Sequence, residues 1–224
     1  MFAFAVGHLS HESKTSFSIW YFYDATLGGT ATEVVKEILL SRDEAAINGL
    51  ELNASKCEAV SSSAIFLSAV CDTLLGCKPI NPDLCDYFGA SIGIRAVRVC
   101  LSKRTEALRS LTDRLKSIDR HDALTLLQTA LGHPRAVYDL RAGTCYRDQA
   151  AIEEYDNALK EAVSTLVCLN FDDKAWKRET LPAVNSGLGL RSANDLLLSA
   201  FISSVVECND MVMRIGMRKP SGRF

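Results

Sequence analysis

The amino-acid sequence predicts an α+β fold that is mostly α-helical, with its strands confined to the first part of the chain. Residues 18–30, SIWYFYDATLGGT, contain two apolar runs, and two glycines end the second run. A turn is expected between the runs, with Asp24 at its tip, and this pattern is typical of a β-hairpin. From about residue 95 the apolar residues recur with a helical period. The chain is therefore expected to contain a small α+β region followed by an all-helical region.

The first region contains one helix signal and two weaker strand signals. Thr30 and Glu33 have the spacing of a capping box, which predicts a helix over residues 31–47 that ends at an Asn-Gly pair. The alternating LELN segment, residues 50–53, predicts a short strand. Glycines and prolines interrupt residues 61–94, so we expect short strands and turns there.

The second region is expected to be a series of helices. The first, over residues 95–120, places five apolar side chains on one face: Leu101, Leu108, Leu111, Leu115 and Ile118. Two shorter helices are predicted over residues 121–131 and 134–140, separated by a Gly-His-Pro break. A longer helix over residues 152–169 carries a second apolar face.

Polar residues mark where several of these helices begin. Asp148 is the predicted N-cap of the long helix, and the Asp172-Asp173 pair is interpreted as a helix cap as well. Ser192 and Asp195 resemble a second capping box, which opens the last helix. The basic tail, residues 209–224, lacks periodicity and is expected to be disordered.

The amino-acid composition argues against several classes of protein. The 224 residues carry a net charge of −2, so any nucleic-acid binding must come from a local basic patch. The eight cysteines include no Cys-x-x-Cys pair, which argues against a structural zinc site and favours reduced thiols in an intracellular protein, cytoplasmic or nuclear. Because no run approaches 18 apolar residues, no membrane segment is expected.

Several segments resemble one protein family in the same order along the chain. They are WYFYDATLGG (20–29), GLELNASKCE (49–58), LLGCKPI (74–80) and FDDKAWKRETLPAVNSGLGLRSA (171–193). Each is similar to a segment of the reverse transcriptases of retroelements, of the non-LTR retrotransposon type. The resemblance implies that residues 1–94 are a partial polymerase palm of hairpin, helix and strand, without the fingers and the upstream palm. It also implies that residues 95–208 are a thumb and post-thumb region.

The resemblance places the chemistry of the family at the hairpin. Intact members are RNA-directed DNA polymerases that hold Mg²⁺ with aspartates, two of them adjacent at the hairpin tip. In this chain Tyr23 stands at the first of these two positions, and Asp24 remains at the second. Since tyrosine is neutral at pH 7, it offers no anionic ligand. Asp24 is thus a vestigial catalytic and metal-binding position, and no cofactor is expected for this fragment.

Lys56 is a second candidate that the resemblance suggests. It matches a lysine close to the incoming nucleotide in the family, where it assists proton transfer. The alternative is an ordinary surface lysine, which we favour because the fragment lacks a nucleotide site.

The predicted thumb helix is the most basic part of the chain. Residues 95–120 carry eight cations and three carboxylates, and in the family this region cradles the template–primer backbone. The candidate contacts to RNA or DNA are Lys103, Arg104, Arg109, Arg114 and Lys116. The alternative interpretation of the same charges is a solvated helix face.

Three functions remain open at this point. The first is a truncated, catalytically inactive reverse transcriptase fragment of a transposable element, in effect a pseudoenzyme. The second is a non-catalytic nucleic-acid-binding module that uses the basic helix. The third is a decayed reading frame without function.

Overall fold

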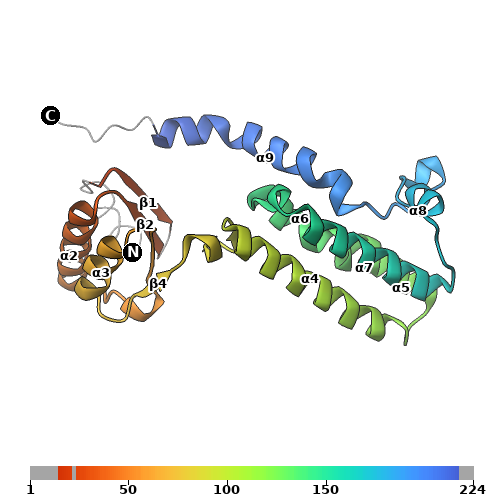
Figure 1. Cartoon of the computed structure of the whole chain (residues 1–224), viewed down its shortest axis with the longest axis horizontal. Helices are drawn as coiled ribbons and strands as arrows, with labels where there is room; N and C mark the ends of the chain where they lie inside the picture. The colour runs from red at the N-terminus through yellow and green to blue at the C-terminus, as the bar shows by residue number, and fades with distance from the viewer. Residues whose placement is uncertain (1–14, 22–23, 217–224) are drawn as a thin grey trace. The chain divides into compact units, whose positions relative to one another are not determined.

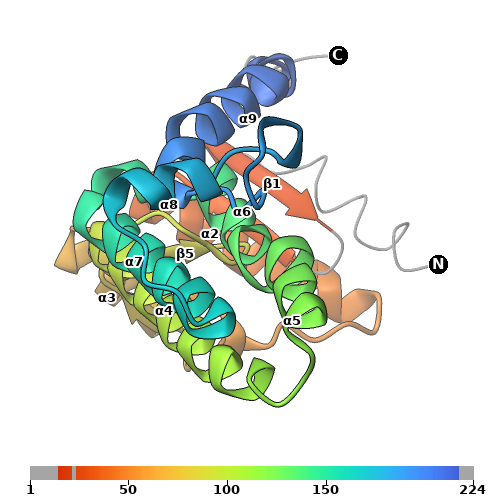
Figure 2. The same ribbon diagram turned by 90° about the vertical axis from the view of Figure 1, so that its right-hand side faces the viewer.

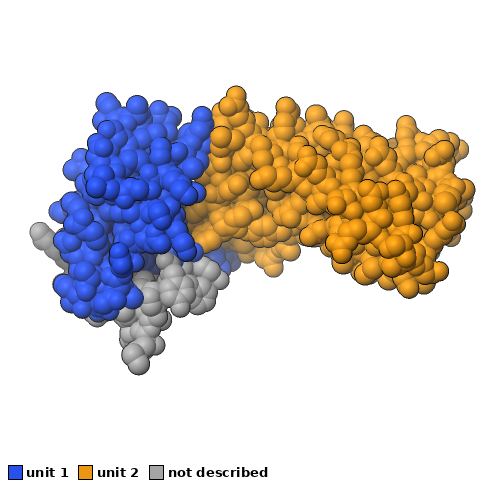
Figure 3. Space-filling view, turned by 90° about the horizontal axis from the view of Figure 1, so that it is seen from below, with its two compact units in different colours: residues 1–82, 210–224 blue, residues 83–209 orange. Residues whose placement is uncertain are grey.

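The computed structural model describes residues 15–21 and 24–216 and divides the chain into two compact units. Unit 1 comprises residues 1–82 and 210–224, and unit 2 comprises residues 83–209 (Figure 3). Helices dominate and the strands are short, which confirms the predicted α+β, mostly helical class. The second unit begins before the predicted boundary at residue 94, because two short strands precede its first helix.

The predicted hairpin is present in unit 1. Strand β1 (Phe17–Tyr21) pairs in antiparallel fashion with β2 (Asp24–Gly28), and Tyr21 lies opposite Asp24. Asp24 is therefore the first residue of β2 and is exposed. Residues 22 and 23, which follow β1 and precede β2 in the sequence, lie outside the described residues, so the position of Tyr23 is not described.

The capping box at residue 30 is confirmed. Helix α2 (Ala31–Ile47) begins after Thr30, whose hydroxyl accepts a hydrogen bond from the Glu33 amide at 3.3 Å. The Glu33 carboxylate in turn accepts one from the Thr30 amide at 2.8 Å. The helix ends at Asn48, as predicted.

The strand predicted over residues 50–53 is wrong. Asn53 instead leads into a 3₁₀ turn, η1 (Ala54–Lys56), and the Ser55 hydroxyl donates to the Asn53 side chain at 2.7 Å. Such local side-chain bonds favour turns over strands. The strand begins later, where β3 (Glu58–Val60) pairs in parallel with β4 (Lys78–Ile80).

Residues 61–94 contain a helix that the sequence did not predict. Helix α3 (Ala64–Thr73) begins after Ser63, whose hydroxyl accepts from the Phe66 amide at 3.3 Å. The glycines and prolines that suggested turns all lie after this helix. Turns and short strands do follow, namely β4, η2 (Pro82–Leu84), β5 (Asp86–Tyr87) and β6 (Ala90–Ser91). The core of unit 1 is formed by Val34, Ile38, Ala59, Val70, Leu74 and Cys77.

Unit 2 is almost entirely helical, as expected. Its helices and turns are α4 (Ile94–Leu115), α5 (Arg120–Leu126), a π turn η3 (Leu127–Leu131), α6 (His133–Ala142), η4 (Cys145–Arg147), α7 (Gln149–Val167), α8 (Asp173–Glu179), η5 (Ala183–Asn185) and the part of α9 (Ala193–Gly216) that ends at residue 209. The helix predicted over residues 95–120 ends at Leu115, because the Asp119 carboxylate accepts from the His121 amide and starts α5. Ile118 is consequently exposed.

The core of unit 2 lies between α4 and α7, which run side by side (Figure 1 and Figure 2). Leu101 and Leu108 of α4 are almost fully buried, as are Ile152 and Leu159 of α7, which confirms the predicted apolar faces within the two helices. The last predicted member of each face, Ile118 and Leu169, lies beyond the end of its helix and is exposed. The buried hydroxyl of Tyr155 donates to the Gly132 carbonyl at 2.9 Å, which ties α7 to the break between η3 and α6.

The last helix is longer than predicted. Ser192 caps α9 by accepting a hydrogen bond from the Asp195 amide at 3.3 Å, as expected, but the helix continues to Gly216. The expected disorder is therefore wrong for residues 209–216, where an apolar Met-Val-Met run without glycine or proline extends the helix. Residues 217–224 lie outside the described residues.

Helix α9 also contains an exposed apolar segment. Among the described residues, Ala193–Arg214 is the one segment that is long and apolar enough to cross a membrane, by length and composition alone. Its large exposed side chains include Leu198, Ile202, Val205 and Val206.

Candidate functional site

The hairpin presents a single carboxylate beside its turn. Asp24 is exposed at the start of β2, and its neighbour in the motif, Tyr23, lies outside the described residues. On β1, the Trp20 indole donates a hydrogen bond to the Ser18 hydroxyl at 2.9 Å, and Trp20 pairs with Ala25 of β2. The local structure thus presents Asp24 to solvent without a described partner side chain.

The described residues do not assemble a magnesium site around Asp24. Across residues 15–21 and 24–216, no three side chains of the His, Cys, Asp and Glu types come close enough to hold a metal ion. Lys56 is exposed at the end of η1, and in the described part of the chain no hydrogen bond or ion pair joins it to Asp24. A two-metal clamp needs several converging carboxylates, so this arrangement does not fit one.

The basic helix α4 separates its cations into two groups. Four of them form ion pairs with carboxylates of unit 2: Arg98, Arg104, Arg109 and Lys116. The other three are exposed and make no ion pair within the described part of the chain: Arg95, Lys103 and Arg114. The five predicted nucleic-acid contacts are therefore not equivalent, because within the described residues Lys103 and Arg114 form no ion pair and the other three do.

Arg104 is held by a fully buried carboxylate. The Arg104 Nε atom lies 3.0 Å from Oδ2 of Asp139 in α6, whose side chain is 0% exposed. The Cys100 thiol donates to the other Asp139 oxygen at 3.4 Å. The hydrogen bond to Asp139 raises the pKa of Arg104, which favours the charged guanidinium. The Arg104 guanidinium is thus paired with a carboxylate in the interior of unit 2.

The Asp139 backbone takes part in the same cluster. Its carbonyl accepts hydrogen bonds from the Gly143 amide at 2.9 Å and from the Cys145 thiol at 3.2 Å. Burial raises the pKa of Cys145 to about 12, so this thiol stays protonated and keeps donating. The cluster therefore fixes the end of α6 and the turn that follows it against α4.

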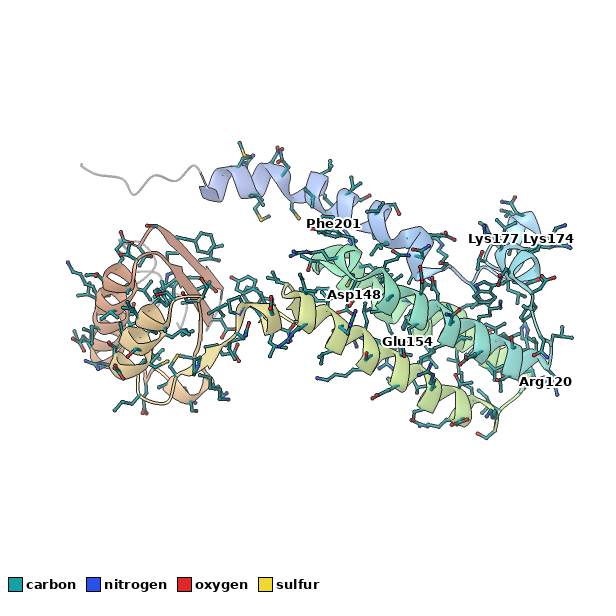
Figure 4. The ribbon with its side chains drawn as sticks, in the orientation of Figure 1. Arg120, Asp148, Glu154, Lys174, Lys177 and Phe201 are labelled. Atoms are coloured by element: carbon teal, nitrogen blue, oxygen red, sulfur yellow. The ribbon has the colours of Figure 1, made fainter. Side chains whose placement is uncertain are left out.

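Asp148 is the N-cap that the sequence predicted, and it has a partner that the sequence did not reveal. Its carboxylate accepts from the Ala151 amide at 3.3 Å and also from Arg98, at 2.8 Å to Nε and 3.2 Å to the terminal nitrogen. The Arg98 guanidinium holds the pKa of Asp148 below its usual value. Figure 4 labels Asp148 at the start of α7, alongside α4.

The remaining pairs of α4 lie at the surface. Arg109 approaches Glu154 at 3.7 Å and Glu161 at 3.9 Å, both on α7 (Figure 4 labels Glu154). Lys116, the C-cap residue of α4, lies 2.7 Å from Asp113 in the last turn of that helix. All of these side chains are at least half exposed, and exposed ion pairs contribute little stability. Arg109 and Lys116 are thus held only weakly.

A second carboxylate inside unit 2 secures the start of α9, and sequence reasoning missed it. Asp156 of α7 accepts from the Ser192 hydroxyl at 2.6 Å and from the amides of Ala193 and Asn194 at 2.7 and 3.0 Å. Burial raises the pKa of Asp156, while these three donors act in the opposite direction. The only sequence signal was the apparent Ser192 cap itself, which gives no indication of a partner on another helix.

The Asp172-Asp173 pair has a structural role, as the sequence indicated. Asp172 caps α8 by accepting from the Ala175 amide at 2.7 Å, and Asp173 lies 3.0 Å from the Lys160 ammonium. Lys174 and Lys177, labelled in Figure 4, stand exposed on the same helix. The pair is therefore not a catalytic dyad.

Comparison with protein families, with curated proteins and with solved structures finds no match to this chain.

A test of the Asp148 pair follows from the direction of its pKa shift. Since the pKa is lowered in the folded state, the ionised carboxylate stabilises the fold above about pH 4, and this stabilisation is lost as the pH falls through the lowered value. The variant Asp148→Asn keeps a capping oxygen but loses the ion pair with Arg98. At pH 7 its thermal midpoint is expected to lie a few degrees below that of the wild type.

The pH dependence of this difference is the informative measurement. The melting curves of wild type and variant, followed by circular dichroism, are expected to converge as the pH becomes strongly acidic. A difference that stays constant from pH 7 to pH 2 would mean that the charge of Asp148 contributes nothing.

Proposed function

We propose that this chain is a palm and thumb fragment of a retrotransposon reverse transcriptase that does not polymerise by itself. The observation that carries the proposal is the hairpin, which has the strand–turn–strand form expected of the family segment and a single exposed carboxylate, Asp24. The capped helix α2 and the β3 strand follow it in the expected order. The similar sequence segments support the family, and the lone carboxylate supports the loss of activity.

The chemical reason for inactivity is the number of ligands. Nucleotide addition requires two metal ions that neutralise the charge developing on the attacking and leaving oxygens. One carboxylate does not hold such a pair, and the neutral side chain of Tyr23 supplies no charge. No other acidic cluster in the described residues takes over this role.

Primer extension tests this proposal directly. The full chain, given a primer–template, Mg²⁺ and deoxynucleotides, is expected to give no extended product, and Asp24→Ala is expected to behave in the same way. Tyr23→Asp restores two adjacent acids but adds no third carboxylate, so it is expected to remain inactive. A metal-dependent ladder that disappears in Asp24→Ala would refute the proposal.

A second candidate function, nucleic-acid binding without chemistry, is favoured by the unpaired cations of α4. Lys103 and Arg114 are exposed and eleven residues apart, which is about three helical turns, so they share one face of the helix. Their separation along the axis is about 16 Å. Cations without carboxylate partners are the ones available to phosphates, which carry charge but no sequence information.

Salt dependence distinguishes phosphate binding from a solvated helix face. If α4 binds a duplex, the double variant Lys103→Gln/Arg114→Gln is expected to lower the slope of log affinity against log salt by about 0.9 for each phosphate that the protein no longer neutralises. Fluorescence anisotropy with a labelled duplex, at several salt concentrations, measures this slope.

The matched control removes the same net charge from unit 1. Lys36 and Arg42 are exposed on α2, so Lys36→Gln/Arg42→Gln is expected to leave the slope unchanged. Equal effects of the two double variants would mean that only net charge matters. Undetectable binding by the wild type at low salt would leave α4 as a solvated face.

A further inference from the structure

Helix α9 carries a row of exposed apolar side chains within unit 2. Four of its large apolar residues are each more than half exposed: Leu198, Ile202, Val205 and Val206. Spacings of four, three and one residues place them on one side of the helix, within an arc of about 100°. A different side of the helix meets unit 2, where Leu197 is 4% exposed in the core and the Phe201 ring lies 4.8 Å from that of Tyr146, centroid to centroid (Figure 4). The four exposed residues form the apolar face of α9.

The polar residues of α9 occupy another side of the helix. Ser199, Ser203 and Glu207 follow one another at intervals of four residues, and all three are exposed, so they form the polar stripe of α9. The Glu207 carboxylate lies 3.0 Å from the Arg141 guanidinium of α6. A carboxylate inside the hydrocarbon core of a bilayer is costly. A helix with this polar stripe is therefore suited to the surface of a membrane rather than to a position across it.

Burial does not explain the apolar character of α9. In the segment Ala193–Arg214, 6% of the most apolar stretch is buried inside the molecule. A helix of similar composition in the core of a water-soluble protein is mostly buried, because the removal of apolar area from water is what stabilises it there. The apolar face of α9 thus has area available to a partner.

The sequence that ends α9 and follows it indicates the charge of that partner. Residues 211–224 contain no aspartate or glutamate and four cations, namely Arg214, Arg218, Lys219 and Arg223, in a chain whose net charge is −2. Cations beside an amphipathic helix complement the anionic headgroups of phospholipids. A second copy of the chain carries the same positive segment and offers these cations no complementary charge. The apolar face and the cations together favour an anionic lipid surface over a second copy.

We propose that α9 binds the surface of a bilayer that contains anionic phospholipids. The helix lies in the plane of the surface, and its apolar face enters the boundary between the headgroups and the acyl chains. The polar stripe stays in water, and the cations of residues 211–224 contact the headgroups. Burial of the four apolar side chains and the attraction of the cations both favour binding. This role involves neither Asp24 nor the cations of α4, so it is independent of the proposed function.

Vesicle flotation with the full chain tests the proposal. The protein is expected to float with vesicles of phosphatidylcholine and phosphatidylserine, and much less with phosphatidylcholine alone. The variant Ile202→Asp/Val206→Asp places two carboxylates on the apolar face and is expected to abolish flotation. The matched control Ser199→Asp/Ser203→Asp adds the same charge to the polar stripe of the same helix and is expected to keep most of the binding. All four positions are exposed, and thermal melts followed by circular dichroism verify that both variants fold.

The contribution of the cations is measured separately. The variant Arg218→Gln/Lys219→Gln is expected to bind the anionic vesicles about 30-fold more weakly than the wild type. Equal flotation of the apolar-face and polar-stripe variants would overturn the proposal, as would a wild type that does not float with anionic vesicles. Light scattering without lipid covers the alternative partner. A wild-type dimer that does not float, and that Ile202→Asp/Val206→Asp converts to a monomer, would assign the apolar face to a second copy instead.

Discussion

The buried carboxylate of Asp139 is the constraint on which the arrangement of unit 2 depends. A charge without solvent exposure is costly unless it is paired and hydrogen-bonded, and here Arg104 and Cys100 of α4 supply the partners. The same residue accepts through its carbonyl from Gly143 and Cys145, so one position holds α4, the end of α6 and the following turn together. The basic character of α4 is therefore partly a requirement of the fold. A charge count alone overstates what this helix offers to a nucleic acid.

Two observations support the proposed function: several cations of α4 are paired with carboxylates, and the hairpin carries a single aspartate. In unit 1 no group of three potential metal-ligating side chains occurs among the described residues, and the proposal of an inactive fragment relies on this observation. In unit 2, Lys103 and Arg114 are exposed and form no ion pair within the described residues, so α4 offers fewer available cations than its charge count suggested. Under the proposed binding function, α4 rather than the hairpin is the element that contacts nucleic acid.

Local signals were sufficient for much of the fold and for little of the site. The capping box at Thr30, the cap at Asp148 and the apolar face of α4 depend on residues close in sequence, and these predictions are confirmed. The errors were also local: LELN alternates over too few residues to define a strand, and later turn residues obscured α3. The partners that decide the site lie far apart in sequence. Arg98 meets a carboxylate fifty residues away, and no pattern in a single sequence encodes that contact.

A double-mutant cycle on Arg104 and Asp139 tests the central claim most directly. The free energy of unfolding in urea is measured for wild type, Arg104→Met, Asp139→Asn and the double variant. If Arg104 is committed to the buried carboxylate, each single variant loses the interaction, and the cycle gives a coupling free energy of about 1 kcal/mol or more. Effects that add to within about 0.3 kcal/mol would contradict the claim and return Arg104 to the cations available for nucleic acid.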